Sequence, residues 1–307
     1  MLRQVSKFAS SIQKGQSPIS VIVARGFCVM KDQKFETLAV NFPKPFVAHV
    51  ELNRPDRLNA FNKKMWYEIG DCFSSLSENP DCRVVVLSAS GKHFTAGIDL
   101  MDMLSLGQQL ADVEEVARKG HLLEKMIKKY QDSISSLEIC TKPVIACVHS
   151  ACVGAGVDLI TAADIRYCSK DAWFQVKEVD IGMAADVGTL QRLPKVIGSQ
   201  SLVRELCFTA RKVKSDEGLA CGLISKVFES KEEMLKGAIE LANEIAAKSP
   251  VAVQATKKNL IYSQTKESQE GLDQIREMNK LYLQSEDFVN ACMAQATKGD
   301  PPVFSKL

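Results

Sequence analysis

Three acidic side chains stand among small and apolar residues in the stretch FQVKEVDIGMAADVGTLQRLP, which runs from residue 174 to 194. A buried carboxylate is costly unless it is paired or hydrogen-bonded, and burial raises its pKa. If Glu178 and Asp186 face one pocket, they could take a proton from one carbon of a substrate and return it at another. Asp180, which precedes Ile181-Gly182, is interpreted as a structural residue that satisfies turn amides.

A glycine-containing turn follows the apolar segment KPVIACVHS and leads into a helical pattern. This turn, Gly154-Ala155-Gly156, leaves main-chain N–H groups free at the helix start, where they suit a developing oxyanion. A second turn, Ala96-Gly97, follows another apolar strand, and an oxyanion hole generally takes two converging donors. A structural alternative stays open, because glycine also allows close packing of a strand on a helix.

Two of the acids also have simpler interpretations. Asp158 falls in the first turn of the helix after Gly156, where the helix dipole favours any acid. Asp186 precedes the helical pattern TLQRLPKVIG and could be its N-cap. Capping therefore remains an alternative to catalysis for both side chains.

The motifs of several other chemistries are missing from the sequence. None of the ten cysteines forms a CxxC pair, and the four histidines lack metal-ligand spacing, so no metal site is predicted. The glycine turn is not a dinucleotide fingerprint, because Leu159 occupies the place of the third glycine. There is no GxSxG elbow, P-loop or HExxH motif.

The segments that must position these residues alternate between two patterns. Strands are expected at FVAHVELN, CRVVVLSAS, KPVIACVHS, IRYCS and WFQV, and helices at NKKMWYEIGDCFSSLSEN and from Val113 to Ser136. After Glu229 the pattern is helical throughout, with four segments that end near Thr297. The alternation predicts a layered or spiral α/β core, followed by a C-terminal helical region.

Composition narrows the class of protein further. Of 307 residues, 46% are hydrophobic and 25% charged, as in ordinary soluble proteins. No apolar run approaches the ~20 residues that a membrane span requires. Without the five basic residues of segment 1–31, the chain holds 34 basic and 37 acidic side chains, which argues against nucleic-acid binding. The scattered cysteines favour reduced thiols in an intracellular compartment.

Both ends of the chain resemble targeting signals. Residues 1–31 carry arginine, lysine and serine but no acid, which is the composition of a mitochondrial transit peptide, and a disordered tail is the alternative. Ser305-Lys306-Leu307 forms the tripeptide that the peroxisomal import receptor reads. We therefore expect the protein in the peroxisome and the mitochondrial matrix, and both organelles oxidise fatty acids.

Four stretches together resemble the enoyl-CoA hydratase/isomerase (crotonase) superfamily: NRPDRLNAFN, HFTAGIDL, KPVIACVHSACVGAGVDLITAADIRYCS and FQVKEVDIGMAADVGTLQRLPKVIG. The resemblance covers about Val47 to Lys258. It implies a crotonase-like ββα spiral core over residues 44–248 and a helical trimerisation region over residues 249–300. It also implies assembly into trimers, which can pair into hexamers.

Within that superfamily, GIDLMDM and KEVDIGMAADVGTLQRLPKVIG are similar to the isomerases of dienoyl thioesters. This implies conversion of a 3,5-dienoyl-CoA into a 2,4-dienoyl-CoA during the β-oxidation of unsaturated fatty acids. No cofactor is implied, since coenzyme A is part of the substrate. An enoyl-CoA hydratase and a non-catalytic acyl-CoA-binding homologue are the two alternatives.

The resemblance also implies a role for individual residues. The N–H groups of Ile98 and Ala155 would form the oxyanion hole, and Asp158, Glu178 and Asp186 would be the catalytic acids, with Asp186 acting at C2 and Glu178 at C6. The implied substrate-binding residues are Ala96, Gly97, Ile98, Asp99, Leu100, Ala155 and Arg57, with Arg54 also near the phosphates of coenzyme A.

Two departures from the hydratase pattern bear on the reaction. Hydratases generally have glutamate at the position of Asp158 and no acid at that of Asp186, so this chain favours isomerisation. Superfamily members usually have glycine where this chain has Ala155. The N–H group survives that change, and an unstrained alanine there requires a negative φ.

Overall fold

A six-stranded sheet with the order β1-β2-β3-β4-β6-β9 carries the fold. In this computed structural model, which describes residues 34–307 apart from the side chains of Leu106 and Gln109, β1 pairs antiparallel with β2 and all other neighbours in this sheet are parallel. Its strands are β1 (Leu38–Lys44), β2 (Val47–Leu52), β3 (Val84–Ala89), β4 (Val144–Val148), β6 (Ile165–Ser169) and β9 (Lys226–Phe228).

A smaller sheet is formed by β5 (Ala151–Val153), β7 (Trp173–Gln175) and β8 (Val213–Lys214), in that order. Its first two strands are parallel and its last two antiparallel. The chain leaves β4 and enters β5 after only two residues, so the two sheets follow each other directly. An isolated bridge joins Thr95, after β3, to Cys152 in β5. Loops that are distant in sequence therefore meet beside the smaller sheet.

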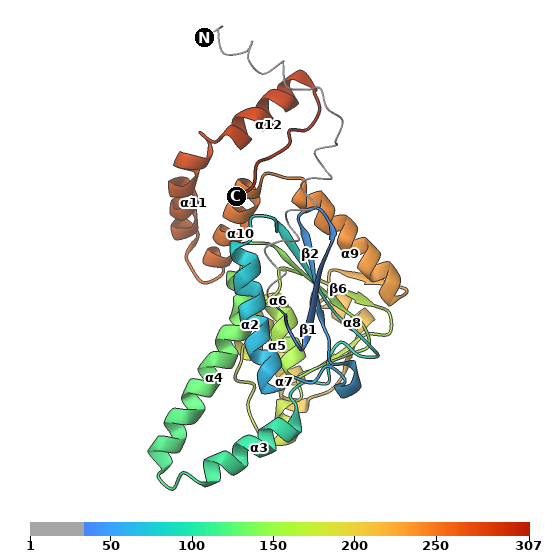
Figure 1. The fold of residues 1–307 in the computed structure, drawn as a ribbon, viewed down its shortest axis with the longest axis vertical. Helices are drawn as coiled ribbons and strands as arrows, with labels where there is room; N and C mark the ends of the chain where they lie inside the picture. The colour runs from blue at the N-terminus through green and yellow to red at the C-terminus, as the bar shows by residue number, and fades with distance from the viewer. Residues whose placement is uncertain (1–33) are drawn as a thin grey trace. The chain divides into compact units, whose positions relative to one another are not determined.

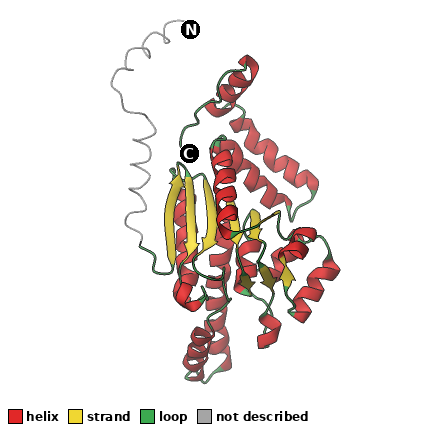
Figure 2. Ribbon diagram, turned by 90° about the vertical axis from the view of Figure 1, so that its right-hand side faces the viewer, coloured by secondary structure: helices red, strands yellow, loops and turns green. Residues whose placement is uncertain are grey.

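Helices surround the sheets, as Figures 1 and 2 show. They are α2 (Lys63–Glu78), α3 (Leu100–Ala111), α4 (Val116–Ile139), α5 (Ala155–Thr161), α6 (Thr189–Val196), α7 (Gln200–Thr209), α8 (Ser215–Ala220), α9 (Lys231–Ala246), α10 (Pro250–Ser263), α11 (Ser268–Tyr282) and α12 (Glu286–Thr297), with the 3₁₀ helices η2 (Pro55–Arg57) and η3 (Glu178–Ile181). Helices α3 and α4 form a hairpin at the opposite end from α11 and α12 (Figure 1).

Helix α9 covers one face of the large sheet with a stripe of mostly small side chains. Ala238 and Ala242 are fully buried and belong to the same core cluster as Val84, Val86 and Ile145 of the sheet. Their spacing of four residues places them on one face of the helix. Because alanine is small, the helix axis can lie close to the parallel strands.

Helix α2 packs against α4 and brings two aromatic rings together. Asn62 accepts a hydrogen bond from the N–H of Met65 and so begins α2. Trp66 of α2 stacks on Tyr130 of α4 with 4.6 Å between ring centroids and 13° between ring planes. The hydroxyl of Ser133 donates to the carbonyl oxygen of Trp66. These two contacts fix the position of α4 relative to α2.

The predicted strands and helices are confirmed, and so are the α/β core and the helical C-terminal region. Strand β1 was not anticipated, since the regular pattern was expected to begin near residue 44. It is an edge strand in which only Leu38 is buried, so its sequence shows no clear apolar alternation. Its register shifts between Asn41 and Lys44, where Pro43 is tolerated because an edge bulge needs no N–H from it.

Residues 35–307 form one compact unit, and the targeting segment predicted at 1–31 lies outside the described residues. Nine cysteines within the described part are free thiols, seven of them buried. Over the same part of the chain, no helix is long and apolar enough to cross a membrane. Near the C-terminus, Arg83 donates to the carbonyl oxygens of Phe304 and Ser305, and Lys306 pairs with Asp81.

Substitution of Ala238 by leucine tests the packing of α9. The larger side chain has no room between helix and sheet, so we expect the free energy of unfolding to fall by about 1–3 kcal/mol. Urea denaturation at fixed protein concentration measures this value. Glu240→Leu, on the exposed side of the same helix, is the control and should change it by less than about 0.5 kcal/mol. Equal effects of the two substitutions would contradict the described packing.

Candidate active site

The two glycine turns predicted from the sequence lie against each other. Gly97 has φ +93° and Gly154 has φ +52°, values that L-residues with side chains rarely adopt. A Cβ atom on Gly97 would lie 3.1 Å from the carbonyl oxygen of Val153, and one on Gly154 would lie 4.0 Å from Cα of Gly97. Glycine at both positions therefore allows the two loops to converge, as the oxyanion-hole hypothesis requires.

The N–H groups of Ile98 and Ala155 have no hydrogen-bond acceptor among the described residues. Phe61 bonds to the carbonyl of Gly97 and the N–H of Asp99, which turns the N–H of Ile98 away from Phe61. Ala155 is the first residue of α5, whose first N–H groups lack intrahelical partners. The φ angle of Ala155 is not positive, so its backbone is unstrained.

Asp158 is completely buried in α5 and contacts the start of another helix. Its Oδ1 atom accepts a hydrogen bond from the main-chain N–H of Thr189, the first residue of α6, while Oδ2 has no partner among the described residues. Burial raises the pKa of Asp158 to about 6, although this hydrogen bond opposes the shift. The side chain thus ties α5 to α6 and does not cap its own helix.

Glu178 opens the 3₁₀ helix η3 and is also buried. A Cβ atom on Gly154 would lie 3.1 Å from its Oε1, so the carboxylate is adjacent to the glycine turn that carries Ala155. Its Oε2 atom has no partner in the described part of the chain. Burial, and then the negative charge of Asp158, raise the pKa of Glu178 to about 7. Such a group exchanges protons readily near neutral pH.

Asp186 lies in the loop before α6 and is half-buried. The N-cap of α6 is Gly188, without a side-chain cap, so the capping interpretation of Asp186 is wrong. Gln131 of α4 donates a hydrogen bond of 2.7 Å to the main-chain carbonyl of Asp186. Burial raises the pKa of this carboxyl above its ordinary value.

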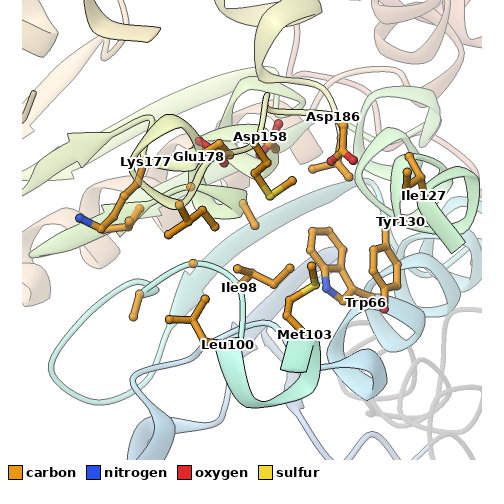
Figure 3. Close-up of a pocket in the computed structure, with 18 of the residues that line it drawn as sticks. Trp66, Ile98, Leu100, Met103, Ile127, Tyr130, Asp158, Lys177, Glu178 and Asp186 are labelled. Atoms are coloured by element: carbon orange, nitrogen blue, oxygen red, sulfur yellow. The ribbon is translucent and has the colours of Figure 1, made fainter. Parts of the chain in front are cut away.

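A cavity that is open to solvent brings these groups together. In Figure 3 the three acids follow one another along one wall, with Glu178 towards Lys177, Asp186 towards Ile127 and Tyr130, and Ile98 on the facing side. Most of the lining is apolar with a few convergent polar groups, as in small-molecule sites. This arrangement can hold an oxyanion on one side while carboxylates move protons on the other.

Not every predicted binding residue lines this cavity. Ala96, Gly97 and Leu100 do, together with both proposed oxyanion residues. Asp99 instead caps α3 and forms an ion pair of 3.2 Å with Arg54. Arg57 is exposed in η2, outside the cavity. Asp180 accepts from the side chain of Lys177 at the surface, so its predicted role with turn amides is not observed.

Several lining residues were not anticipated from the sequence: Trp66, Met103, Met126, Ile127, Tyr130, Lys177, Ile181, Met183 and Val187. Most are apolar residues of helices, which a sequence pattern assigns equally well to the core. Lys177 and Ile181 flank the acids in sequence, and that proximity was the only available signal. Among residues 34–307, no three histidine, cysteine, aspartate or glutamate side chains are grouped as metal ligands.

Comparison with known proteins gives a consistent result. The Delta(3,5)-Delta(2,4)-dienoyl-CoA isomerase, mitochondrial, of Homo sapiens is 53% identical over 279 residues, which are 90% of this chain and 84% of the human one. The peroxisomal isomerase of the same name from Arabidopsis thaliana is 45% identical over 85% of this chain and 93% of its own. The solved structure of an enoyl-CoA hydratase from Bacillus anthracis superposes with a TM-score of 0.78 at 24% identity, covering 87% of this chain and 98% of that one.

The last of these similarities confirms the crotonase-like fold predicted from the sequence. The sequence model of the family described as "Enoyl-CoA hydratase/isomerase" matches residues 44–305. This range includes both glycine turns and all three acids. The chain therefore belongs to the enoyl-CoA hydratase/isomerase family.

Proposed function

We propose that this protein is an isomerase that converts a 3,5-dienoyl-CoA into the conjugated 2,4-dienoyl-CoA. The observation that carries the proposal is the placement of Glu178 and Asp186 on one wall of a cavity, opposite the free N–H group of Ile98. Relatives that are 45–53% identical over most of the chain are named for this reaction. The dienoyl-CoA activity predicted from the sequence is thereby favoured over hydration.

The reaction consists of two proton transfers, one from C2 and one to C6, with no net change in protons, and it needs no other reactant. The N–H groups of Ile98 and Ala155 hold the thioester oxygen. A carboxylate removes a proton from C2, and the electron pair spreads through the diene onto that oxygen, which the two N–H groups stabilise. A second carboxyl group, which starts protonated, donates its proton to C6, and the 2,4-diene forms. The first carboxyl group then releases its proton to water and the second takes one up, which restores the starting state. Such positioned acid–base groups typically accelerate a reaction by 10²–10⁴-fold.

We assign proton removal at C2 to Glu178 and proton return at C6 to Asp186, the reverse of the order that the resemblance implied. C2 is bonded to the carbonyl carbon, so its base must be the acid nearer the oxyanion hole. Glu178 Oε1 is adjacent to Gly154, next to the Ala155 N–H, whereas in Figure 3 the Asp186 side chain lies farther along the wall, towards Ile127 and Tyr130. This geometry supports the new order.

Asp158 supports the other two acids. One of its oxygens is engaged by the N–H of Thr189, which leaves a single free oxygen. Its charge helps to raise the pKa of Glu178, so that Glu178 can both take and release a proton near neutral pH. A hydratase would use the acid at this position to activate water, and Asp158 is both short and already occupied.

The remaining features of the proposal concern the substrate and its location. Coenzyme A is part of the substrate, and no cofactor enters the mechanism. Arg57 is exposed and stays a candidate contact for coenzyme A phosphates at the mouth of the site. The relatives are named as mitochondrial in Homo sapiens and peroxisomal in Arabidopsis, the two compartments predicted for this protein. Import through Ser305-Lys306-Leu307 would require release of Lys306 from Asp81 and of Ser305 from Arg83.

Self-association as a trimer or hexamer is also part of this proposal. The C-terminal helices expose a set of large apolar side chains: Leu260, Leu272, Leu281, Leu283, Phe288, Val289 and Met293. A concentration of exposed large apolar side chains in one region of the chain is typical of subunit interfaces.

Two substitutions separate the roles of the acids. We expect Asp186→Asn to retain deuterium exchange at C2 of a 3,5-dienoyl-CoA in D₂O but to lose at least ~10²-fold in formation of the 2,4-diene. Glu178→Gln should lose both the deuterium exchange at C2 and the formation of the 2,4-diene. Mass spectrometry follows the exchange, and ultraviolet absorbance follows the conjugated product.

A binding measurement completes this test. Calorimetric affinity for a saturated acyl-CoA should be nearly unchanged in both variants, which shows that the fold and the binding site persist. Full activity of Asp186→Asn would remove Asp186 from the mechanism. Loss of exchange in Asp186→Asn, with retention in Glu178→Gln, would restore the opposite order.

The raised pKa of Glu178 predicts a dependence of stability on pH. The native state keeps this proton up to about pH 7, whereas the unfolded chain releases it near pH 4.5. The group therefore stabilises the native state most fully below pH 4.5, and this contribution is lost as pH rises through 7. As pH rises from 4.5 to 8, we expect the free energy of unfolding of Glu178→Gln to increase by roughly 3 kcal/mol relative to that of the unsubstituted protein. Urea denaturation at both pH values measures the gain.

The matched control is Glu240→Gln, whose carboxylate lies on the exposed side of α9. It should show no pH-dependent gain of this size. A Glu178→Gln protein whose relative stability is the same at both pH values would show that this carboxyl is not buried as described.

The assembly is tested through its exposed leucines. The protein should scatter light as three or six chains of about 33.8 kDa each. The double substitution Leu272→Asp and Leu281→Asp should lower that mass to one chain, because charges would enter an apolar interface. Glu277→Gln on the same helix is the control. A monomeric unsubstituted protein at micromolar concentration would refute the proposal.

A further inference from the structure

Three of the four main-chain N–H groups in residues 96–99 have an acceptor, and the fourth does not. The first and the last donate to carbonyl oxygens of the segment 58–61, at 3.0 Å each. The N–H of Gly97 donates to the side-chain hydroxyl of Thr95 at 3.1 Å. The N–H of Ile98 is left without an acceptor among the described residues. It is the group that the proposed reaction needs.

The main chain of Thr95 joins this turn to the strand that leads to the other oxyanion donor. The N–H of Thr95 donates to the carbonyl oxygen of Ala151 at 3.0 Å, and its carbonyl oxygen accepts from the N–H of Val153 at 3.2 Å. Both partners belong to β5, which ends two residues before Ala155. The two donors of the oxyanion hole are therefore connected through one residue.

The side chain of Thr95 is fully buried, and its hydroxyl forms two hydrogen bonds. It donates to the carbonyl oxygen of Asn59 at 2.7 Å and accepts from the N–H of Gly97. Serine and threonine hydroxyls fix turns in this way, by binding a main-chain N–H two residues later. Thr95 does not line the catalytic cavity, so it acts on the site only through its neighbours.

The methyl group of Thr95 fills space on the other side, at the start of α5. A Cβ atom on Gly156 would lie 2.4 Å from Cγ2 of Thr95 and 3.1 Å from Sγ of Cys152. Gly156 directly follows Ala155 in the first turn of α5. The hydroxyl therefore faces one oxyanion loop while the methyl group packs against the other.

We propose that Thr95 is a positioning residue of the oxyanion hole, and that its hydroxyl directs the N–H of Ile98 towards the thioester oxygen. This inference rests on the proposed isomerase function. The N–H of Ile98 shares a peptide plane with the carbonyl of Gly97, which accepts from the N–H of Phe61 at 2.8 Å. Thr95 holds the preceding peptide plane through the N–H of Gly97. With both planes held, the φ angle of Gly97 is fixed at +93° and the free N–H has one direction.

Substitution of Thr95 by valine tests the proposal, because valine keeps the shape of the side chain and removes the hydroxyl. We expect kcat for a 3,5-dienoyl-CoA to fall by at least ~10-fold, since a displacement of about 1 Å in a reacting site can cost ~10²-fold in rate. KM should change by less than ~3-fold, because the bond to the oxygen is stronger in the charged transition state than in the bound substrate. Steady-state kinetics followed by ultraviolet absorbance gives both values.

Infrared spectroscopy gives a second readout that needs no turnover. The probe is a saturated acyl-CoA labelled with ¹³C at the thioester carbonyl. Hydrogen bonds to the carbonyl oxygen lower its stretching frequency, so the frequency should fall when the probe binds the unsubstituted protein. The shift should be smaller in Thr95→Val.

Two control variants separate positioning from stability. Thr95→Ser keeps the hydroxyl but loses the methyl contact with Gly156, so kcat and the carbonyl shift should persist although the protein unfolds at a lower urea concentration. Thr37→Val removes another buried threonine hydroxyl, one that donates to Glu68 at 2.6 Å and does not line the cavity. It should leave kcat and the carbonyl shift unchanged. A purely structural role would instead make activity follow stability.

Thr95→Ala differs from Thr95→Ser only by the hydroxyl, and it replaces the valine variant if that does not fold. Full kcat and a full carbonyl shift without the hydroxyl would overturn the proposal. Equal losses in Thr95→Ser and Thr95→Val would also overturn it, since the methyl contact would then be responsible. So would the lack of any carbonyl shift in the unsubstituted protein. If that protein shifts the carbonyl but forms no 2,4-diene, the proposed function fails, and the shifts in the variants still decide the role of Thr95.

Discussion

The placement of two buried carboxyl groups and one half-buried carboxyl group on one wall of a cavity is the constraint on which the rest of the site depends. A buried carboxylate needs either a partner or a proton, and here the partners are few. Asp158 accepts one hydrogen bond, from the main-chain N–H of Thr189 at the start of α6. That bond holds the loop of Asp186 against α5, and Gln131 holds the same loop against α4. The acids share one wall because two helices are tied to one loop.

The burial that makes these carboxyl groups useful for proton transfer also lowers the stability of the folded protein. Apolar surroundings keep the pKa of Glu178 near 7, where proton transfer in either direction is easy, and the same surroundings disfavour its charged form. The packing of α9 on the large sheet, away from the substrate, offsets this cost, and so does the packing of α2 on α4 beside the cavity. Within the two turns, positive φ angles fall on glycine, since Gly97 and Gly154 take them and Ala155 does not.

The sequence was sufficient to predict the parts of the site that have local causes. Free N–H groups follow from a glycine turn before a helix, and Asp158 and Asp186 are unusual enough to be recognised as chemical groups. The contacts that decide their roles are not local. The Asp158 to Thr189 bond spans 31 residues, and Trp66 meets Tyr130 only because α2 packs on α4. Strand β1 was missed for a related reason, because an edge strand exposes most of its side chains and has little apolar pattern.

In the proposed reaction, a proton leaves C2 and a proton returns at C6 of a dienoyl thioester within this cavity. The direct test is to incubate the purified protein with a 3,5-dienoyl-CoA and, in parallel, with a 2-enoyl-CoA. We expect a rise in ultraviolet absorbance from the 2,4-conjugated product and little addition of water to the 2-enoyl thioester. Rapid hydration of the 2-enoyl-CoA without formation of a conjugated diene would contradict it.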